Sequence, residues 1–189
     1  MAGVTSPADF PGFLPMDTEL PPPEIREARL AALLAELGIA VRTFEHAPVF
    51  TVEEARALRG SLPGGHSKNL FLKDKKGGLW LVVAEETRKV DLNALAKRIG
   101  APRFSFGSAD LLGAVLGVPP GSVTPFALMN DHEGKVRAVV DEGLFAHAVV
   151  NFHPLRNDRT TAIAPDDLRR FLLATGHAPL VLALPEAGG

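Results

Sequence analysis

Three short segments of the chain carry groups whose types and spacing could do chemistry. The first is the pair Lys68-Asn69, which stands at the start of the apolar run Leu70-Phe71-Leu72. A lysine in this position can point into a pocket and meet an anionic or carbonyl oxygen of a ligand. A solvated lysine at the edge of a strand is the more common interpretation, and the residues of this segment alone favour it.

The second segment is a tight loop between two constrained ends, and it consists of Gly121, Ser122, Val123, Thr124 and Pro125. Glycine allows unusual backbone angles and proline restricts them. A loop of this kind can direct several backbone N–H groups at one point, which is how proteins hold an oxyanion or a polarised carbonyl. An ordinary turn between a helix and a strand is the alternative.

The third segment is Asn151-Phe152-His153-Pro154, in which His153 is the chemically active group. The pKa of histidine is close to neutrality, so His153 could act as a general base or orient a bound group. A hydrogen-bonded histidine at the end of a strand, before Pro154, is the structural alternative.

Several other chemistries are excluded by missing residues. The chain has no cysteine, so it has no thiolate nucleophile, no Cys-ligated zinc and no iron–sulfur cluster. The spacing of its six histidines predicts no metal site, and we expect no cofactor. No Gly-x-Ser-x-Gly elbow is present, and the glycine-rich segment before Ser67 has His66 where a phosphate-binding loop needs lysine.

Length and composition indicate an ordinary globular domain. The chain has 189 residues, of which 46% are hydrophobic and 22% charged, with a net charge of −2. This charge excludes a globally basic nucleic-acid-binding protein. Between His66 and Arg103, however, nine basic residues face four acidic ones, which suits either a local phosphate-binding surface or a solvated face.

The N-terminal residues 1–10 lack a basic region followed by an apolar run, and no apolar stretch approaches the ~20 residues that span a bilayer. We therefore expect a cytoplasmic protein with no membrane partner. Residues 1–23 are rich in proline and predict an irregular arm, whereas residues 24–187 predict one folded domain.

The elements expected to position the three segments are short helices and short strands in mixed order. Helices are expected over residues 25–37, 51–59, 91–99, 109–116 and 165–175. Strands are expected over residues 41–46, 69–73, 79–84, 104–106, 126–129, 136–140, 149–153, 160–163 and 180–184. This order predicts an α+β fold with a mixed, curved central sheet surrounded by helices.

Taken together, the segments Gly64–Leu72, Gly121–Phe126 and Asn151–Pro154 resemble the YbaK/prolyl-tRNA synthetase editing-domain family, and within it the free-standing deacylases of Ala-tRNA(Pro). The resemblance covers residues 24–184. It implies hydrolysis of the ester between a wrong amino acid and the 3′-terminal adenosine of tRNA, here alanine on tRNA(Pro).

The resemblance also implies roles for individual residues. Lys68 would engage the 3′ end of the substrate, and the Gly121–Pro125 loop would lie near the scissile carbonyl. Asn69 and His153 match two further functional positions of the family, and we favour positioning over proton transfer for His153. Positioned water and oxyanion stabilisation can suffice for an activated ester, so no protein nucleophile is required.

The resemblance leaves other functions open. A deacylase of Cys-tRNA(Pro) would use the same mechanism, and a catalytically silent module that binds tRNA or a synthetase would keep the fold without the reaction. The expected partners are the acceptor end of mischarged tRNA(Pro) and, transiently, prolyl-tRNA synthetase or an elongation factor.

Overall fold

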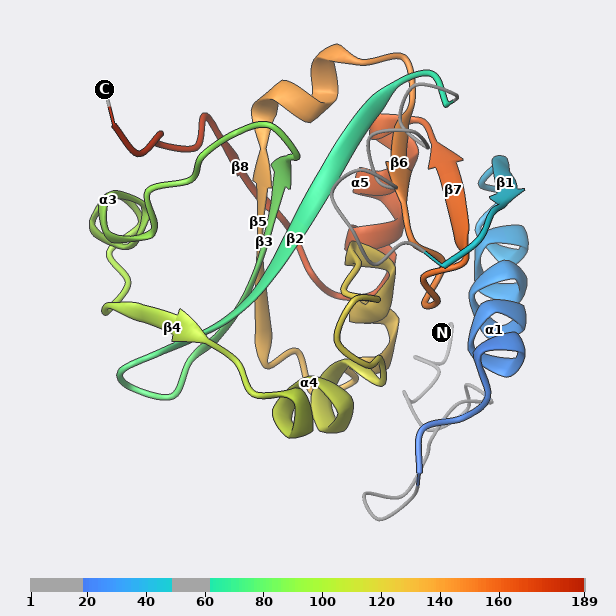
Figure 1. The fold of residues 1–189 in the computed structure, drawn as a ribbon, viewed down its shortest axis with the longest axis horizontal. Helices are drawn as coiled ribbons and strands as arrows, with labels where there is room; N and C mark the ends of the chain where they lie inside the picture. The colour runs from blue at the N-terminus through green and yellow to red at the C-terminus, as the bar shows by residue number, and fades with distance from the viewer. Residues whose placement is uncertain (1–18, 49–61, 189) are drawn as a thin grey trace, which may run out of the picture.

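The fold is described from a computed structural model, which describes residues 19–48 and 62–188 (Figure 1). Its centre is an eight-stranded mixed sheet in the order β1-β7-β6-β2-β3-β5-β8, with β4 paired to β2. The strands are β1 (Val41–Glu45), β2 (Gly65–Asp74), β3 (Leu79–Glu85), β4 (Phe104–Phe106), β5 (Val136–Asp141), β6 (Val150–Phe152), β7 (Arg159–Ile163) and β8 (Leu180–Leu182). The predicted α+β fold with a mixed sheet is confirmed.

Short helices surround the sheet, and their ends follow local sequence signals. The α-helices are α1 (Pro23–Glu36), α3 (Leu92–Arg98), α4 (Ala109–Leu116) and α5 (Pro165–Ala174), and the 3₁₀ helices are η2 (Pro125–Asn130) and η3 (Glu142–Ala146). Asp91 caps α3 by accepting hydrogen bonds from the N–H groups of the first turn, and Ser108 caps α4 in the same way. Pro165 occupies the first position of α5, as predicted.

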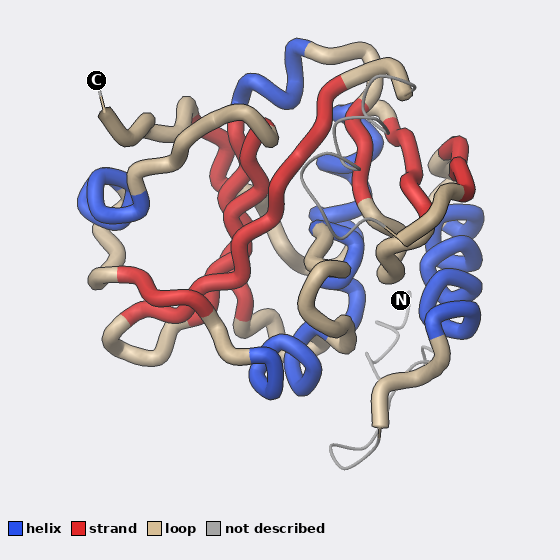
Figure 2. The backbone as a smooth tube through the Cα atoms, viewed as in Figure 1, coloured by secondary structure: helices blue, strands red, loops and turns tan. Residues whose placement is uncertain are grey.

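The long strand β2 joins the two halves of the sheet, because it lies between β6 and β3 in the strand order. Figure 2 shows the strands of both halves in red on the two sides of this long strand. One edge of β2 pairs with β3 from Ser67 to Lys73. The other edge pairs with β6 only at Gly65 and His66 and with β4 only from Leu72 to Asp74. Between these two pairings, the edge of β2 has no strand partner within the described part of the chain.

Two apolar cores lie on the two faces of the sheet. Helices α1, α4 and α5 pack on one face, where Phe71, Leu81 and Val83 of β2 and β3 are buried. Helix α3 packs on the other face, where Leu72 and Val82 are buried. Successive residues of a strand point to opposite faces, so each core takes every second residue of β2 and β3.

One predicted element is wrong in type. Residues 126–129 were expected to form a strand, but they lie in the 3₁₀ helix η2. Pro125 fixes the first helical angle, and Thr124 caps the helix by accepting a hydrogen bond from the Phe126 N–H. Phe126 is fully buried and meets Phe152 and Phe171 edge to face, so the apolar run reflects burial rather than a strand.

Other boundaries differ by a few residues. Strand β2 begins at Gly65, four residues before the predicted start, because it continues through glycine and polar residues to meet β6. The remaining predicted strands and helices are present with end shifts of about one or two residues, as is usual for element boundaries. The helix expected over residues 51–59 lies outside the described residues.

Candidate functional site

The Gly121–Pro125 loop is held in shape by its own sequence. Gly121 has a φ of 86°, a left-handed backbone angle that glycine adopts without strain. The Ser122 N–H donates to the Pro119 carbonyl at 3.1 Å, and the Ser122 side chain is buried. Thr124, fully buried, begins η2 together with Pro125. The loop is therefore a fixed structure rather than an open connection.

Asn69 fastens this loop to the unpaired edge of β2. Its side-chain amide Nδ2 donates to the Val123 carbonyl at 3.0 Å, and a longer contact of 3.5 Å reaches the Ser67 hydroxyl. The Ser67 hydroxyl in turn donates to the Asn151 carbonyl of β6 at 3.2 Å. Side chains of β2 thus connect two of the three predicted segments, the loop and the Asn151–Pro154 segment.

The loop leaves hydrogen-bonding groups available. Within residues 19–48 and 62–188, the backbone N–H groups of Val123 and Thr124 have no hydrogen-bond partner. The buried Asn69 Oδ1 also has no partner there. An unsatisfied buried polar atom costs about 1–3 kcal/mol, which a bound donor would recover. Two donors and one acceptor therefore lie on neighbouring residues of one small region.

Lys68 lies on the opposite face of β2 from Asn69. Lys68 pairs with Ala84 of β3. By the alternation of the strand it shares a face of β2 with Leu72, whereas Asn69 shares the other face with Phe71. The half-buried Lys68 side chain makes no hydrogen bond or ion pair in the described part of the chain. The structure thus brings Asn69, and not Lys68, into contact with the loop.

His153 lies directly after β6 and has a defined tautomer. Its Nδ1–H donates to the Arg159 carbonyl at 3.1 Å, which leaves Nε2 as the free ring nitrogen. Burial lowers the pKa of His153, and the nearby His46 adds to this effect, so the ring is neutral at neutral pH. No hydrogen bond between described residues joins His153 to Lys68, Asn69 or the loop.

Asn151, to which the sequence analysis assigned no role of its own, holds β2 and β6 together. The Asn151 amide donates to the Pro63 carbonyl at 3.0 Å and to the Gly65 carbonyl at 3.1 Å. It thereby fixes the start of β2 against β6. Asn151 belongs to a segment that the sequence analysis singled out, but its role depends on a partner 86 residues away.

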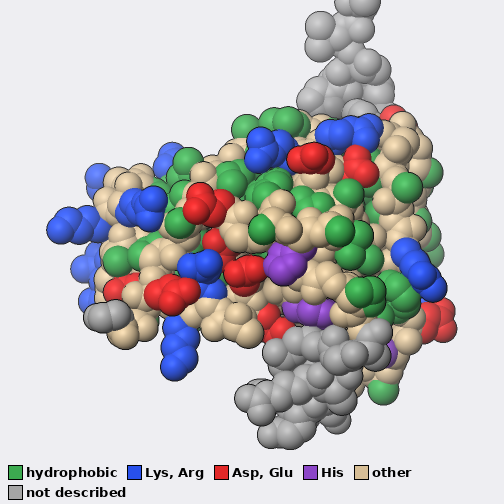
Figure 3. All heavy atoms as spheres, turned by 90° about the horizontal axis from the view of Figure 1, so that it is seen from above, with side chains coloured by type: hydrophobic (Ala, Val, Ile, Leu, Met, Phe, Trp, Pro, Cys, Tyr) green, Lys and Arg blue, Asp and Glu red, His purple; other side chains and the backbone are tan. Residues whose placement is uncertain are grey.

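Glycine is required where β2 meets β6. A Cβ atom at Gly65 would lie 2.5 Å from the His147 ring, and one at Gly64 would lie 2.5 Å from the Val149 carbonyl. His147 is fixed by Glu85 of β3, with 2.8 Å between His147 Nε2 and a carboxylate oxygen. In the view of Figure 3, histidine and carboxylate side chains lie close together near the middle of the molecule. The glycines thus allow the backbones of β2 and β6 to meet at Gly65 and His66, and the unpaired part of the β2 edge begins after these residues.

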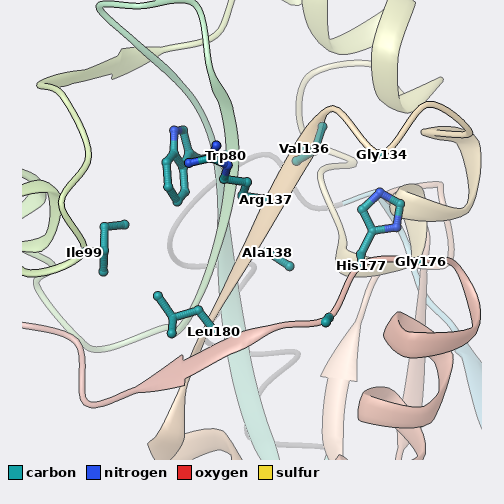
Figure 4. Close-up of a pocket in the computed structure, with 10 residues that line it drawn as sticks. Trp80, Ile99, Gly134, Val136, Arg137, Ala138, Gly176, His177 and Leu180 are labelled. Atoms are coloured by element: carbon teal, nitrogen blue, oxygen red, sulfur yellow. The ribbon is translucent and has the colours of Figure 1, made fainter.

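A hollow of about 410 Å³ lies elsewhere, at the edge of β5 (Figure 4). Its lining includes Trp80, Arg137 and His177 but none of the predicted site residues. His177 is hydrogen-bonded to Asp131 at 3.0 Å, and Arg137 lies over the Trp80 ring, so its polar groups are already engaged. We therefore do not assign the reaction to this hollow.

The described residues contain no group of three or more His, Asp or Glu side chains placed to hold a metal ion. Among the same residues, no helix is both long enough and apolar enough to cross a membrane.

Comparison with known proteins identifies the family. The model of the aminoacyl-tRNA editing domain matches residues 46–171, which include Lys68, the Gly121–Pro125 loop and His153. This chain belongs to the aminoacyl-tRNA editing domain family. The expected family is thereby confirmed, whereas the subgroup of Ala-tRNA(Pro) deacylases stays a prediction.

Two curated relatives cover most of the editing domain. Prolyl-tRNA synthetase associated domain-containing protein 1 of Danio rerio is 41% identical over 164 residues, 86% of this chain and 89% of the relative. Prolyl-tRNA editing protein ProX of Acetoanaerobium sticklandii is 37% identical over 147 residues, 77% of this chain and 90% of the relative.

A solved structure supports the fold. A candidate trans-editing enzyme for prolyl-tRNA synthetase superposes with a TM-score of 0.66 over 86% of this chain and 98% of that chain. At 22% identity, this likeness concerns the arrangement of the editing domain's sheet and helices.

Proposed function

We propose that this editing domain acts in trans as a hydrolase that removes alanine from mischarged tRNA(Pro). The proposal is supported by membership of the aminoacyl-tRNA editing domain family and by the two relatives whose names refer to prolyl-tRNA editing or synthetase association. The observation that carries it is the Asn69–Val123 hydrogen bond. This bond fixes a loop in which two N–H groups have no partner among residues 19–48 and 62–188, beside a stretch of β2 that no described strand pairs.

In the proposed reaction, a water molecule attacks the ester carbonyl carbon, and the carbonyl oxygen becomes an oxyanion. The N–H groups of Val123 and Thr124 donate to this oxygen. One such donor is typically worth about 3–4 kcal/mol in the transition state. The bond to the 3′ oxygen of the ribose then breaks, the 3′ oxygen takes up the proton that the attacking water has given up, and alanine and free tRNA(Pro) leave.

The other predicted residues have binding or shaping roles in this scheme. Gly121 and Pro125 constrain the loop, and Ser122 closes it through its N–H. Asn69 is a positioning residue that acts through the loop. Lys68 approaches from the other face of β2, and a ligand lying along the open edge of the strand can meet both faces, so we assign its ammonium group to the 3′-terminal nucleotide.

His153 is proposed to orient the bound 3′ end through Nε2, since Nδ1–H is held by the Arg159 carbonyl. Its lowered pKa keeps Nε2 unprotonated and able to accept a hydrogen bond from a ribose hydroxyl. The hydroxyl of the substrate's own ribose is the group that then assists proton transfer to the leaving oxygen.

Alanine is the expected amino acid because it is one that a prolyl-tRNA synthetase can attach to tRNA(Pro) by mistake. A synthetase pocket shaped for proline cannot strongly reject a smaller amino acid, since each methylene is worth only about 1–3 kcal/mol. A second, smaller pocket can admit alanine and exclude proline by steric clash. Editing by size therefore needs a confined site with a rigid wall, and we assign this wall to the anchored loop.

The test is a deacylation time course with the purified chain on Ala-tRNA(Pro), Cys-tRNA(Pro) and Pro-tRNA(Pro). We expect selective loss of alanine, and loss of activity in Lys68→Ala without a change in melting temperature. The matched control is Lys135→Ala, an exposed lysine paired with Glu133 in a distant turn. Selective loss of cysteine would contradict alanine as the substrate. No hydrolysis of any of the three would contradict the proposed activity and favour a module that only binds tRNA.

A further inference from the structure

A second surface carries charge that the proposed reaction does not use. Exposed cationic side chains gather where the β2–β3 turn, β4, the last turn of α3 and the adjoining part of β5 come together. Figure 3 shows Lys and Arg side chains concentrated at the left edge, the end of the molecule that carries α3 and β4 in Figure 1. We call this surface the basic end; it comprises Lys73, Lys75, Lys76, Lys97, Arg103 and Arg137.

The basic end stands on a rigid frame. The Lys75 N–H donates to the Arg103 carbonyl at 3.2 Å, and Lys73 pairs with Ser105 of β4, so the turn and β4 are fixed together. The Arg137 guanidinium lies 4.9 Å from the centre of the Trp80 ring. Figure 4 shows the two side chains next to each other. Side chains presented from a fixed backbone lose less entropy when they bind a ligand.

The buried Asp74 carboxylate attracts the Arg137 guanidinium, but the other charges of the basic end have no carboxylate partner among the described residues. No ion pair joins any of its six side chains to a carboxylate of the described residues. Asp74, the acidic residue within the frame, is buried and accepts hydrogen bonds from the Lys76 and Gly78 N–H groups and from Trp80 Nε1. In contrast, Arg88, Arg156 and Arg159 each contact at least one carboxylate.

Strand β4, which belongs to the frame of the basic end, also carries an exposed aromatic ring. Phe106 at the end of β4 is 68% exposed, the most exposed of the large hydrophobic side chains in the described part of the chain. Cationic side chains with an exposed aromatic neighbour are typical of surfaces that track a nucleic-acid backbone and stack on a base or sugar.

The basic end lies at a useful distance from the site. Lys68 and Asp74 are six residues apart on β2, so at about 3.3 Å per residue they are separated by about 20 Å. A nucleic-acid duplex carries one charge per ~1.7 Å of axis, which gives on the order of twelve phosphates over that length. An RNA whose 3′ end occupies the site can therefore extend its stem to the basic end.

We propose that the basic end binds the phosphate backbone of the RNA stem next to the aminoacylated 3′ end. This inference rests on the proposed function. It adds the surface by which the protein would distinguish a full tRNA from a small aminoacyl ester. It explains how a chain with a net charge of −2 can bind RNA, because the positive field is confined to one end.

The test compares two triple variants with the same change of charge. The first is Lys75→Gln, Lys76→Gln and Arg103→Gln in the basic end. The control is Arg29→Gln, Arg42→Gln and Arg169→Gln, which lie on α1, β1 and α5. Melting temperatures of both variants confirm that they are folded.

Fluorescence anisotropy with uncharged tRNA measures binding at several salt concentrations. We expect the basic-end variant to bind about tenfold or more weakly and to lose about one unit of salt slope per lost phosphate contact, whereas the control resembles the wild type. Equal affinity and equal salt slope in the two variants would overturn the proposal and point to a protein partner for this surface.

Steady-state kinetics on two substrates test the same proposal independently. With full-length mischarged tRNA, the basic-end variant should show a raised KM and an unchanged kcat, and it should hydrolyse a short aminoacylated 3′ oligonucleotide as fast as the wild type. Equal loss on both substrates would contradict stem binding. If the wild type hydrolyses neither, the proposed function fails, while the anisotropy measurement still decides whether the basic end binds RNA.

Discussion

Replacing Asn69 with alanine should damage catalysis more than stability. The variant loses the 3.0 Å hydrogen bond to the Val123 carbonyl and the weaker contact to the Ser67 hydroxyl. A neutral hydrogen bond contributes about 0.5–1.5 kcal/mol, and the carbonyl left without its partner adds to the loss. We expect a loss of about 1–2 kcal/mol, which in a domain of this size lowers the melting temperature by about 2–8 °C.

The catalytic effect should be larger because the loop is free to move. A displacement of about 1 Å at a reacting group can cost about 100-fold in rate. Steady-state hydrolysis of Ala-tRNA(Pro) should therefore show a kcat reduced by about 100-fold and a KM changed by less than about threefold. Asn69→Asp should not restore the rate, since a carboxylate cannot donate to the Val123 carbonyl.

The matched control is Asn130→Ala. Asn130 Nδ2 donates to the Leu116 carbonyl at 2.8 Å, so the same type of hydrogen bond is lost, but not one made to Val123 or Thr124. This control should lose similar stability and keep its kcat. If Asn69→Ala retains normal kcat, or if both variants lose rate equally, the loop is not positioned by Asn69 as we infer.

Three further predictions concern the backbone and the titration of the site. Gly121→Ala should cost about 1–2 kcal/mol from its positive φ alone, because a Cβ there meets no neighbouring atom, and should lower kcat; unchanged denaturation and rate would contradict a fixed loop. Gly65→Ala should destabilise the domain by about 1–3 kcal/mol through the clash with His147, and His147→Ala in the same chain should recover much of this in urea titrations; absence of recovery would mean that another contact excludes the Cβ. Burial lowers the pKa of His153 below its ordinary value near 6.5, so the unfolded chain binds the extra proton and the free energy of unfolding should fall as pH decreases below about 6.5. His153→Gln should show a smaller fall in urea titrations between about pH 7 and pH 5, and equal slopes would show that His153 does not titrate in this way.

The sequence predicted most elements because their signals are local. Ser108 caps α4 and Pro165 begins α5 where the pattern placed them. The strand predicted after Pro125 was wrong because a short apolar segment has no periodicity that distinguishes a strand from a buried 3₁₀ helix. The early start of β2 at Gly65 was missed because its glycine is required by the distant His147 ring.

The sequence was enough to propose residues for the candidate site, but it could not give their arrangement. The Gly121–Pro125 loop was recognisable from its two end residues, and the alternation of a strand already separates Lys68 from Asn69. Which of these two faces the loop depends on the packing of β2 between the two cores. The contact of His153 with the Arg159 carbonyl likewise depends on how β6 and β7 meet.

The most direct measurement of the central claim is a backbone NMR titration with a non-hydrolysable amide analogue of alanyl-adenosine. The account predicts that the largest shift changes occur at the Val123 and Thr124 N–H groups and at the Asn69 side-chain amide. The chain has one tryptophan, Trp80, whose indole N–H reports on the hollow at β5. Shift changes at that indole, with the Val123 and Thr124 signals unchanged, would contradict the assignment of the site.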